Sequence, residues 1–187
     1  MEALCEMCKL LYNPLRLEIL MRTYAARDGV NVGVLGEAMK PSGLGVSGVS
    51  QYLKQLERIG VVRRERAGCY VNYMPDTRRA RPKVRQFVEA LAAGAGKVDL
   101  VPLGFVFGAL MNPFRARVVA AVAQAGAIPL AEICERTHHP VRRLGHDLRM
   151  AVDAGLIDPD DSEAACATYH YIEPVDPLSR LLVSLLA

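Results

Sequence analysis

The sequence predicts a mainly α-helical protein with small β-hairpin wings, built as two similar copies in tandem. Three observations favour this fold class. Apolar residues recur at helical spacing along most of the chain, Leu, Val and Ala dominate the composition, and segments of the first half return in the same order in the second. The 187 residues can form one large domain or two small ones, and the repeat favours two.

The repeat extends over almost the whole chain, which indicates a duplication with one domain at residues 1–96 and another at residues 97–187. The matched pairs are "LLYNPLRLEILMRTYAARDG" (10–29) with "ALMNPFRARVVAAVAQAG" (109–126), "LGEAM" (35–39) with "LAEIC" (130–134), "YVNYMP" (70–75) with "YHYIEP" (169–174), and "RQFVEAL" (85–91) with "RLLVSLL" (180–186).

Each copy is predicted to begin with three helices. A leading helix, at about 2–11 or 102–111, stops at Asn-Pro, because proline presets the first turn of the next helix. The remaining ranges are 14–27 or 113–125 for the second helix, closed by Gly29 or Gly126, and 33–39 or 129–136 for the short third helix.

A fourth helix and a hairpin follow. Val49, Leu53, Leu56 and Ile59 fall at helical spacing and predict one buried face, and Gly60 ends the helix. "VVRRER", a turn at Ala67-Gly68 and "CYVNYM" predict a β-hairpin, and a last helix is expected at about 81–93. This order is that of a winged helix-turn-helix with an extra helix at each end.

The motifs also carry a family resemblance. "NPLRLEIL", "VGVLGEAM" and "SGVSQYLKQLERIGVVRRERAGCYVNY" resemble the ArsR (arsenical-resistance repressor) family, which runs Asp/Asn-Pro-x-Arg-x-x-Ile-Leu, Ser-x-Val-Ser-x-His-Leu-x-x-Leu and Gly-Leu-Val before a basic wing. The resemblance covers nearly all of residues 1–93, with a weaker copy over 100–187. Tyr52 stands where the family usually has His, Gln51 where it often has Arg, and the usual arrangement is a single-domain dimer. The resemblance implies a DNA-binding transcriptional regulator that acts as a repressor.

In the first copy, the exposed side of the fourth helix and the hairpin are expected to contact double-stranded DNA. The N-terminal part of such a helix enters the major groove, and basic side chains around it neutralise phosphates. The hydroxyl of Tyr52 is expected to reach the backbone. The candidate residues are Ser47, Gly48, Ser50, Gln51 and Tyr52 on the helix, and Lys54, Arg63, Arg64 and Arg66 for phosphates.

The second copy is a weaker candidate. Arg142, Arg143 and His146 occupy the positions of Ser47, Gly48 and Gln51, but Asp147 replaces Tyr52 and the acidic wing "DPDDSEA" (158–164) would repel phosphate. A degenerate DNA reader, a protein-binding face and an effector domain all fit this pattern.

The net charge of the two copies also differs, with the first copy basic and the second acidic. Residues 1–96 carry 15 Lys and Arg against 9 Asp and Glu, whereas residues 97–187 carry 8 against 11. The first copy is therefore the expected main DNA reader. The alternative is a tandem winged-helix adaptor that binds protein without base-specific DNA binding.

Two motifs suggest other chemistry. Gly43, Gly45 and Gly48 spell G-x-G-x-x-G, but a dinucleotide site needs a strand before the glycines, and the preceding "LGEAMKPS" predicts helix and turn. Cys5-x-x-Cys8 is a weak metal or thiol-oxidant candidate, and its place in an apolar stripe favours packing.

Several classes of function are not expected. The chain lacks a Ser/His/Asp arrangement, a phosphate loop and paired carboxylates, so we expect neither an enzyme nor a cofactor. Five cysteines without an export signal predict reduced thiols and a cytoplasmic protein, and the longest apolar run, 100–111, is too short to span a membrane.

The expected arrangement of the copies is a covalent pseudo-dimer. The leading and last helices of the second copy are apolar and are expected to pack the copies together, with "DTRRARPKV" (76–84) helping to bridge them. Two fourth helices would then lie about 34 Å apart. If only the first copy reads DNA, two chains must associate as a homodimer to bind a palindrome. The sequence does not identify an effector.

Overall fold

The fold is known from a computed structural model, which describes residues 1–26, 28–94, 100–138, 141–160 and 166–186, without the side chains of residues 141–143. The described chain is mainly helical and contains two three-stranded antiparallel sheets. The prediction of a mainly α protein with small hairpins is thereby confirmed.

The chain divides into two compact units. The N-terminal unit is Leu10–Val98, and the C-terminal unit joins Met1–Lys9 to Asp99–Ala187. The division falls inside helix α1 (Glu2–Leu11), so the first nine residues group with the opposite half from the one that the repeat boundary at 96/97 implied. Leu4 and Met7 of α1 are fully buried. The periodicity of α1 identifies its buried face, but not the partner of that face.

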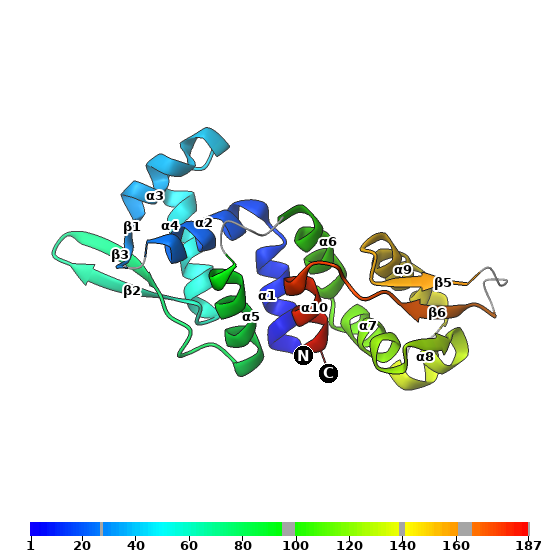
Figure 1. Cartoon of the computed structure of the whole chain (residues 1–187). Coiled ribbons are helices and arrows are strands. Elements are labelled where there is room, and N and C mark those ends of the chain that lie inside the picture. Colours follow the sequence, from blue (N-terminus) through cyan, green and yellow to red (C-terminus); the bar gives the residue numbers. More distant parts are fainter. Residues whose placement is uncertain (27, 95–99, 139–140, 161–165, 187) are drawn as a thin grey trace. The chain divides into compact units, whose positions relative to one another are not determined.

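In the N-terminal unit, a helical body carries a hairpin that projects away from it (Figure 1). Pro14 opens α2, and the Asn13 side chain caps it by accepting a hydrogen bond from the Arg16 amide at 3.1 Å. The sheet order is β1-β3-β2. The elements are α2 (Pro14–Ala25), β1 (Val30–Asn31), α3 (Val32–Met39), the 3-10 turn η1 (Lys40–Ser42), α4 (Val46–Arg58), β2 (Val62–Ala67), β3 (Tyr70–Pro75) and α5 (Pro82–Ala93).

Helix α4 buries the face that its sequence predicted. Val49, Leu53 and Leu56 are fully buried, whereas Ile59 lies just beyond the helix end and is half-buried. Helices α3 and α4 approach closely at Gly36, where an added Cβ would lie 3.0 Å from the Val46 Cα. A larger residue at this position would push α3 and α4 apart.

The hairpin differs from its prediction by one residue at the turn. Ala67 pairs with Tyr70, so the two turn residues are Gly68 and Cys69 rather than Ala67 and Gly68. Gly68 adopts a φ of 61°, a conformation that a tight turn between two strands requires. The following "DTRRARPKV" segment runs from the end of β3 into α5 inside the N-terminal unit, so it is not the linker between the units.

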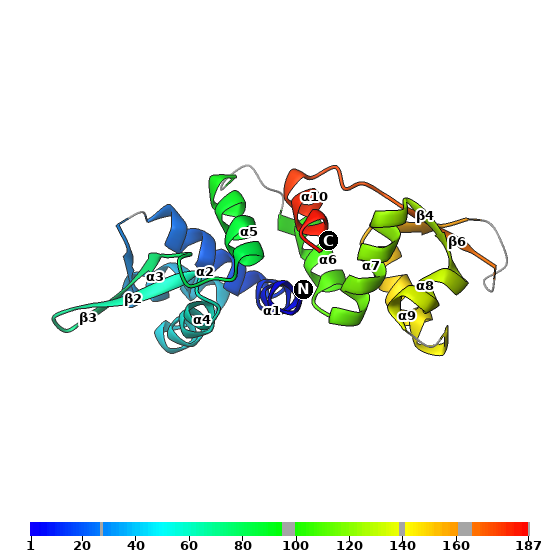
Figure 2. The same cartoon turned by 90° about the horizontal axis from the view of Figure 1, so that it is seen from below.

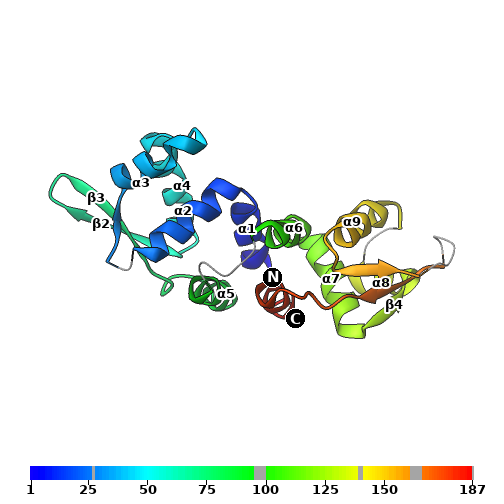
Figure 3. The same ribbon diagram turned by 45° about the horizontal axis from the view of Figure 1, so that its top comes forward.

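In the C-terminal unit, helices α1, α6 and α10 lie side by side (Figure 2), and α7 packs against α8, α9 and β6 (Figure 3). The sheet order is β4-β6-β5. The elements are α6 (Leu100–Leu110), α7 (Pro113–Ala125), β4 (Ala127–Pro129), α8 (Leu130–Thr137), α9 (Val141–Asp153), β5 (Ile157–Pro159), β6 (Thr168–Tyr171) and α10 (Pro177–Ser184).

The same order of elements recurs in both units. The series α2-β1-α3-α4-β2-β3 is matched by α7-β4-α8-α9-β5-β6. In both sheets the strand that comes last in the sequence, β3 or β6, lies in the middle. Both series are compatible with a winged-helix layout. They differ after the short helix α3 or α8: η1 follows α3 in the N-terminal unit, whereas α8 ends at His138 in a left-handed conformation in the C-terminal unit.

Within the described residues, no single helix combines the length and apolar character needed to cross a membrane. Helices α6 and α7 meet these criteria only as a pair, and that pair is bent by 105°.

Candidate nucleic-acid interface

One side of α4 presents polar side chains to solvent. Ser47, Gln51 and Lys54 are exposed, and they follow one another at helical spacing from the first turn onward. Gly48 and Ser50 are half-buried instead. The Leu44 side chain covers Gly48, since an added Cβ there would lie 2.5 Å from the Leu44 Cδ1 atom. The accessible part of the predicted surface is therefore a narrow stripe.

The glycines before and within α4 do not form a dinucleotide loop. Gly43 follows η1 with a φ of 74°, Gly45 is the N-cap of α4, and Gly48 lies inside the helix. Helix α3 and η1 precede them, and the described strand on that side, β1, comes before α3. The strand-turn-helix context that a pyrophosphate site needs is not found in residues 28–60.

Tyr52 contacts the second helix. The Arg16 guanidinium lies over the Tyr52 ring, with 5.3 Å from Cζ to the ring centroid, and Tyr52 is half-buried. A cation over an aromatic face is attracted by the ring quadrupole, so this pair helps to fix α4 on α2. Sequence analysis did not identify Arg16 as a neighbour of the candidate surface.

The three arginines of strand β2 have different environments. Arg63 is half-buried and is paired with Glu65 at 2.9 Å and with Asp76 at 3.8 Å. Arg64 and Arg66 are exposed and form no ion pair with any described residue, and the same holds for Lys54. Arg63 therefore already has two carboxylate partners, whereas Arg64 and Arg66 have no ion-pair partner among the described residues.

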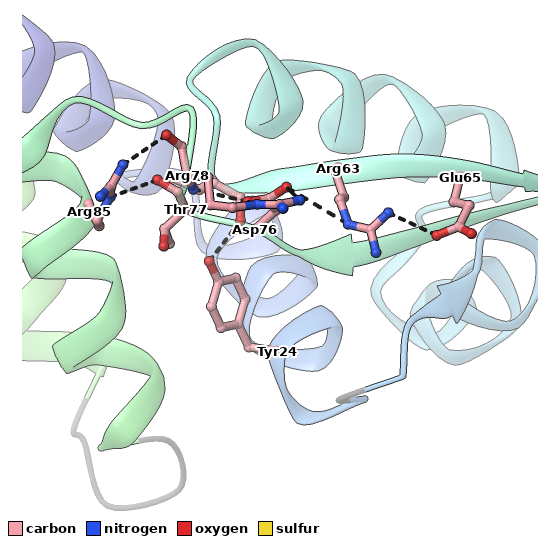
Figure 4. Close-up of polar contacts among 8 residues, drawn as sticks. Tyr24, Arg63, Glu65, Asp76, Thr77, Arg78 and Arg85 are labelled. Carbon is pink, nitrogen blue, oxygen red and sulfur yellow. Dashed lines mark hydrogen bonds and ion pairs between the residues drawn. The ribbon is translucent and has the colours of Figure 1, made fainter.

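A polar network lies at the base of the hairpin (Figure 4). Arg78 donates two hydrogen bonds to the Asp76 carboxylate, from Nε at 3.0 Å and from Nη2 at 2.8 Å, and the Arg78 amide donates a third at 2.9 Å. These bonds lower the pKa of Asp76 to about 2, so the carboxylate stays ionised. Arg78 and its neighbour Arg79 were not predicted as site residues, although the run "TRRAR" was a visible signal.

The backbone around this network is fixed from two sides. The Tyr24 hydroxyl donates to the Val61 carbonyl at 2.7 Å, and burial raises the pKa of this tyrosine. Arg85 on α5 donates from Nε to the Thr77 carbonyl at 2.9 Å and from Nη2 to the Arg78 carbonyl at 2.8 Å. Strand β2 and the segment after β3 are therefore held at defined positions (Figure 4).

The equivalent helix of the C-terminal unit is arranged differently. Asp147 on α9 is buried and pairs with the buried Arg115 of α7, whose Nε lies 3.2 Å from Oδ1. Arg115 also donates from Nη1 to the Gly108 carbonyl at 2.8 Å. The Asp147 charge is thus neutralised internally and does not add to a surface that repels phosphate.

Only some of the remaining candidates in the C-terminal unit lie among the described residues. His146 is exposed on α9. The side chains of Arg142 and Arg143 lie outside the described residues, and so do residues 161–164 of the acidic wing. The described part of that wing contains the exposed Asp158 and the half-buried Asp160, whose Oδ1 accepts a hydrogen bond from the Thr168 amide at 3.1 Å.

Cys5 and Cys8 are both buried on α1. Burial is the main cause that raises the pKa of each thiol above its ordinary value. The thiolate is the form that binds metals and reacts with oxidants, so this environment favours packing over chemistry. Among the residues that the structure describes, no group of three or more His, Cys, Asp or Glu side chains could hold a metal ion.

Comparisons of the chain with protein-family models, curated proteins and solved structures found no match.

Proposed function

We propose that the chain is a sequence-specific DNA-binding transcriptional regulator, with the N-terminal unit as its DNA reader. The observation that carries this proposal is the exposed stripe Ser47, Gln51 and Lys54 on α4, beside a hairpin on which Arg64 and Arg66 have no ion-pair partner among the described residues. The unpaired cations can contact DNA phosphates, and the hydrogen-bonding side chains of α4 can contact base edges in the major groove, as the second helix of a helix-turn-helix does.

Each part of this surface has a distinct role in the proposal. Gln51 can contact an adenine through its N6 and N7 atoms in the major groove, and Ser47 can donate to or accept from a neighbouring base. Lys54, Arg64 and Arg66 neutralise phosphates, which gives affinity that decreases as salt increases. Tyr52 supports the helix through its contact with Arg16.

The motifs quoted above support the further proposal that both units are winged helix-turn-helix domains of ArsR type and that the protein acts as a repressor. The shared order of elements supports a duplication. The C-terminal unit is proposed to contribute less to base reading, because the position equivalent to Tyr52 is a buried carboxylate. Packing of the copies as a pseudo-dimer belongs to the same proposal.

Selection of binding sites from random duplex DNA tests this function. We expect an enriched motif, and we expect log affinity to decrease linearly with log salt concentration. Arg64→Ala and Arg66→Ala should each lower the magnitude of that slope by about one. Arg136→Ala is the matched control, since Arg136 is an exposed arginine of the C-terminal unit that is paired with Glu132.

The symmetry of the selected motif separates the proposed arrangements. An asymmetric motif in two parts, with centres about 34 Å apart, indicates that both fourth helices bind DNA. A palindrome with one part for each chain indicates that the N-terminal units of two chains bind together. Selection without any enriched motif would contradict DNA reading and favour the protein-interaction adaptor.

A further inference from the structure

A second positively charged feature lies at the base of the hairpin, where a pocket of about 500 Å³ opens to solvent. Its lining combines four arginines with two carboxylates, so the pocket has an excess of positive charge. The lining residues are Glu57 at the end of α4, Arg63 and Arg64 of β2, and Asp76, Arg78 and Arg79 after β3.

The charges inside the pocket are only partly balanced. The Asp76 carboxylate forms ion pairs with two guanidinium groups, that of Arg78 at 2.8 Å and that of Arg63 at 3.8 Å. Arg64 and Arg79 form no ion pair with any residue in the described part of the chain. Two guanidinium groups thus remain available to a ligand, next to two that are already oriented.

The wall that carries Arg78 and Arg79 is held in place by a close backbone approach. Gly60 has a φ of 77°, and an added Cβ there would lie 2.7 Å from both the Arg79 carbonyl carbon and the Ala80 amide nitrogen. Arg85 fixes the same segment through the Thr77 and Arg78 carbonyls. A pocket whose walls are ordered before binding loses less entropy when a ligand enters.

We propose that this arginine pocket is a binding site for a phosphate group. Guanidinium groups match the oxygens of a phosphate in charge and in planar geometry, and a pocket of this volume suits a small phosphorylated molecule such as a nucleotide or pyrophosphate. The pocket lies at the C-terminal end of α4, about 15 Å along the helix from Ser47 at the α-helical rise. The proposal therefore does not depend on base reading by the N-terminal end of α4.

Titration of the full chain with pyrophosphate, in the absence of DNA, tests the site by calorimetry. We expect saturable binding that Arg79→Ala weakens about tenfold and Arg79→Lys weakens less. Asp76→Asn should strengthen binding, because it removes a negative charge from the pocket. Arg81→Ala is the matched control: Arg81 is exposed, caps α5 without a side-chain hydrogen bond and lies outside the pocket lining, so its loss should leave binding unchanged.

A second arm identifies the source of the phosphate. If Arg79→Ala weakens binding of a selected DNA duplex and pyrophosphate competes with that duplex, the DNA backbone occupies the pocket. If Arg79→Ala leaves DNA affinity unchanged while it weakens pyrophosphate binding, the ligand is a free phosphorylated molecule. Either result supports a phosphate site.

Two results would overturn the proposal. One is equal pyrophosphate affinity for Arg79→Ala and Arg81→Ala; the other is no saturable pyrophosphate binding together with unchanged DNA affinity in Arg79→Ala. Failure of the proposed DNA reading is distinguishable from both, because Gln51→Ala changes only the α4 stripe and should leave pyrophosphate binding intact.

Discussion

The two units differ in the contact that joins the fourth helix to the helix after Asn-Pro. In each, an arginine in the first turn of the helix after Asn-Pro contacts the same position of the fourth helix. In the N-terminal unit Arg16 lies over the Tyr52 ring, whereas in the C-terminal unit Arg115 forms a buried ion pair with Asp147. The fourth helix of the N-terminal unit therefore has the uncharged Tyr52 at this position, whereas that of the C-terminal unit has a buried carboxylate, Asp147. The side chain at this position therefore distinguishes a half-buried aromatic contact on α4 from a buried ion pair on α9.

The largest expected effect comes from breaking the buried pair. Asp147→Ala should destabilise the C-terminal unit by about 3 to 5 kcal/mol, because Arg115 remains buried without its counterion. Tyr52→Ala should cost the N-terminal unit about 1 to 2 kcal/mol through the lost ring contact. Urea denaturation followed by circular dichroism measures both. The double variant Arg115→Met with Asp147→Leu should recover most of the loss, and an equal cost for Asp147→Ala and Tyr52→Ala would contradict the contrast.

The glycines that end the fourth helices provide the second comparison. Gly60 and Gly155 both have positive φ values, of 77° and 66°, but an added Cβ meets backbone only at Gly60 and open space at Gly155. Gly60→Ala should cost about 3 kcal/mol or more, and Gly155→Ala about 1 to 2 kcal/mol from backbone strain alone. Thermal and urea midpoints of the two variants are the measurement. Similar losses would show that the approach of the 79–80 backbone to Gly60 is relaxed in solution.

DNA affinity provides the third comparison, since Gln51 and His146 occupy matching positions on α4 and α9. Gln51→Ala should weaken binding to a selected duplex by about 1 to 3 kcal/mol and relax the preference at one base pair. His146→Ala should change binding by less than about 0.5 kcal/mol. Fluorescence anisotropy at fixed salt measures both affinities. A larger loss for His146→Ala would make the C-terminal unit the main reader.

The smallest expected effect is a pH dependence at the hairpin base. Because the pKa of Asp76 is lowered to about 2 in the folded chain, its contribution to stability is present above the unfolded pKa of about 4 and is lost as pH falls toward 2. After allowance for solvent screening, we expect a loss of about 1 kcal/mol. Urea midpoints at pH 5 and pH 2.5 should show this difference for the wild type. In Asp76→Asn it should be smaller, and an unchanged pH dependence in that variant would assign the effect to other carboxylates.

Local patterns in the sequence were sufficient for much of the fold. Asn-Pro located the starts of α2 and α7, where Asn13 and Asn112 cap the helices, and the spacing of Val49 and Leu53 identified the buried face of α4. These features depend on neighbours within one or two helical turns. Their physical causes are therefore contained in short stretches of chain.

The details that sequence reasoning missed depend on residues far apart in the chain. Asp76 lies 3.8 Å from Arg63 because β2 pairs with β3, and Arg16 meets Tyr52 through helix packing. The predicted stripe on α4 was accurate for Gln51 but too wide at Gly48, which Leu44 covers. Helical periodicity shows which side of a helix faces outward, but not which neighbouring side chain shields it.

The grouping of Met1–Lys9 with Asp99–Ala187 has a consequence for folding. The apolar face of α1 is covered only when residues 1–9 meet residues that lie far along the sequence, beyond the whole of the N-terminal unit. Long sequence separation between contacting segments slows folding. A fragment of residues 1–96 would carry α1 without the segments that cover its apolar face. Separate expression of the N-terminal unit should therefore omit residues 1–9.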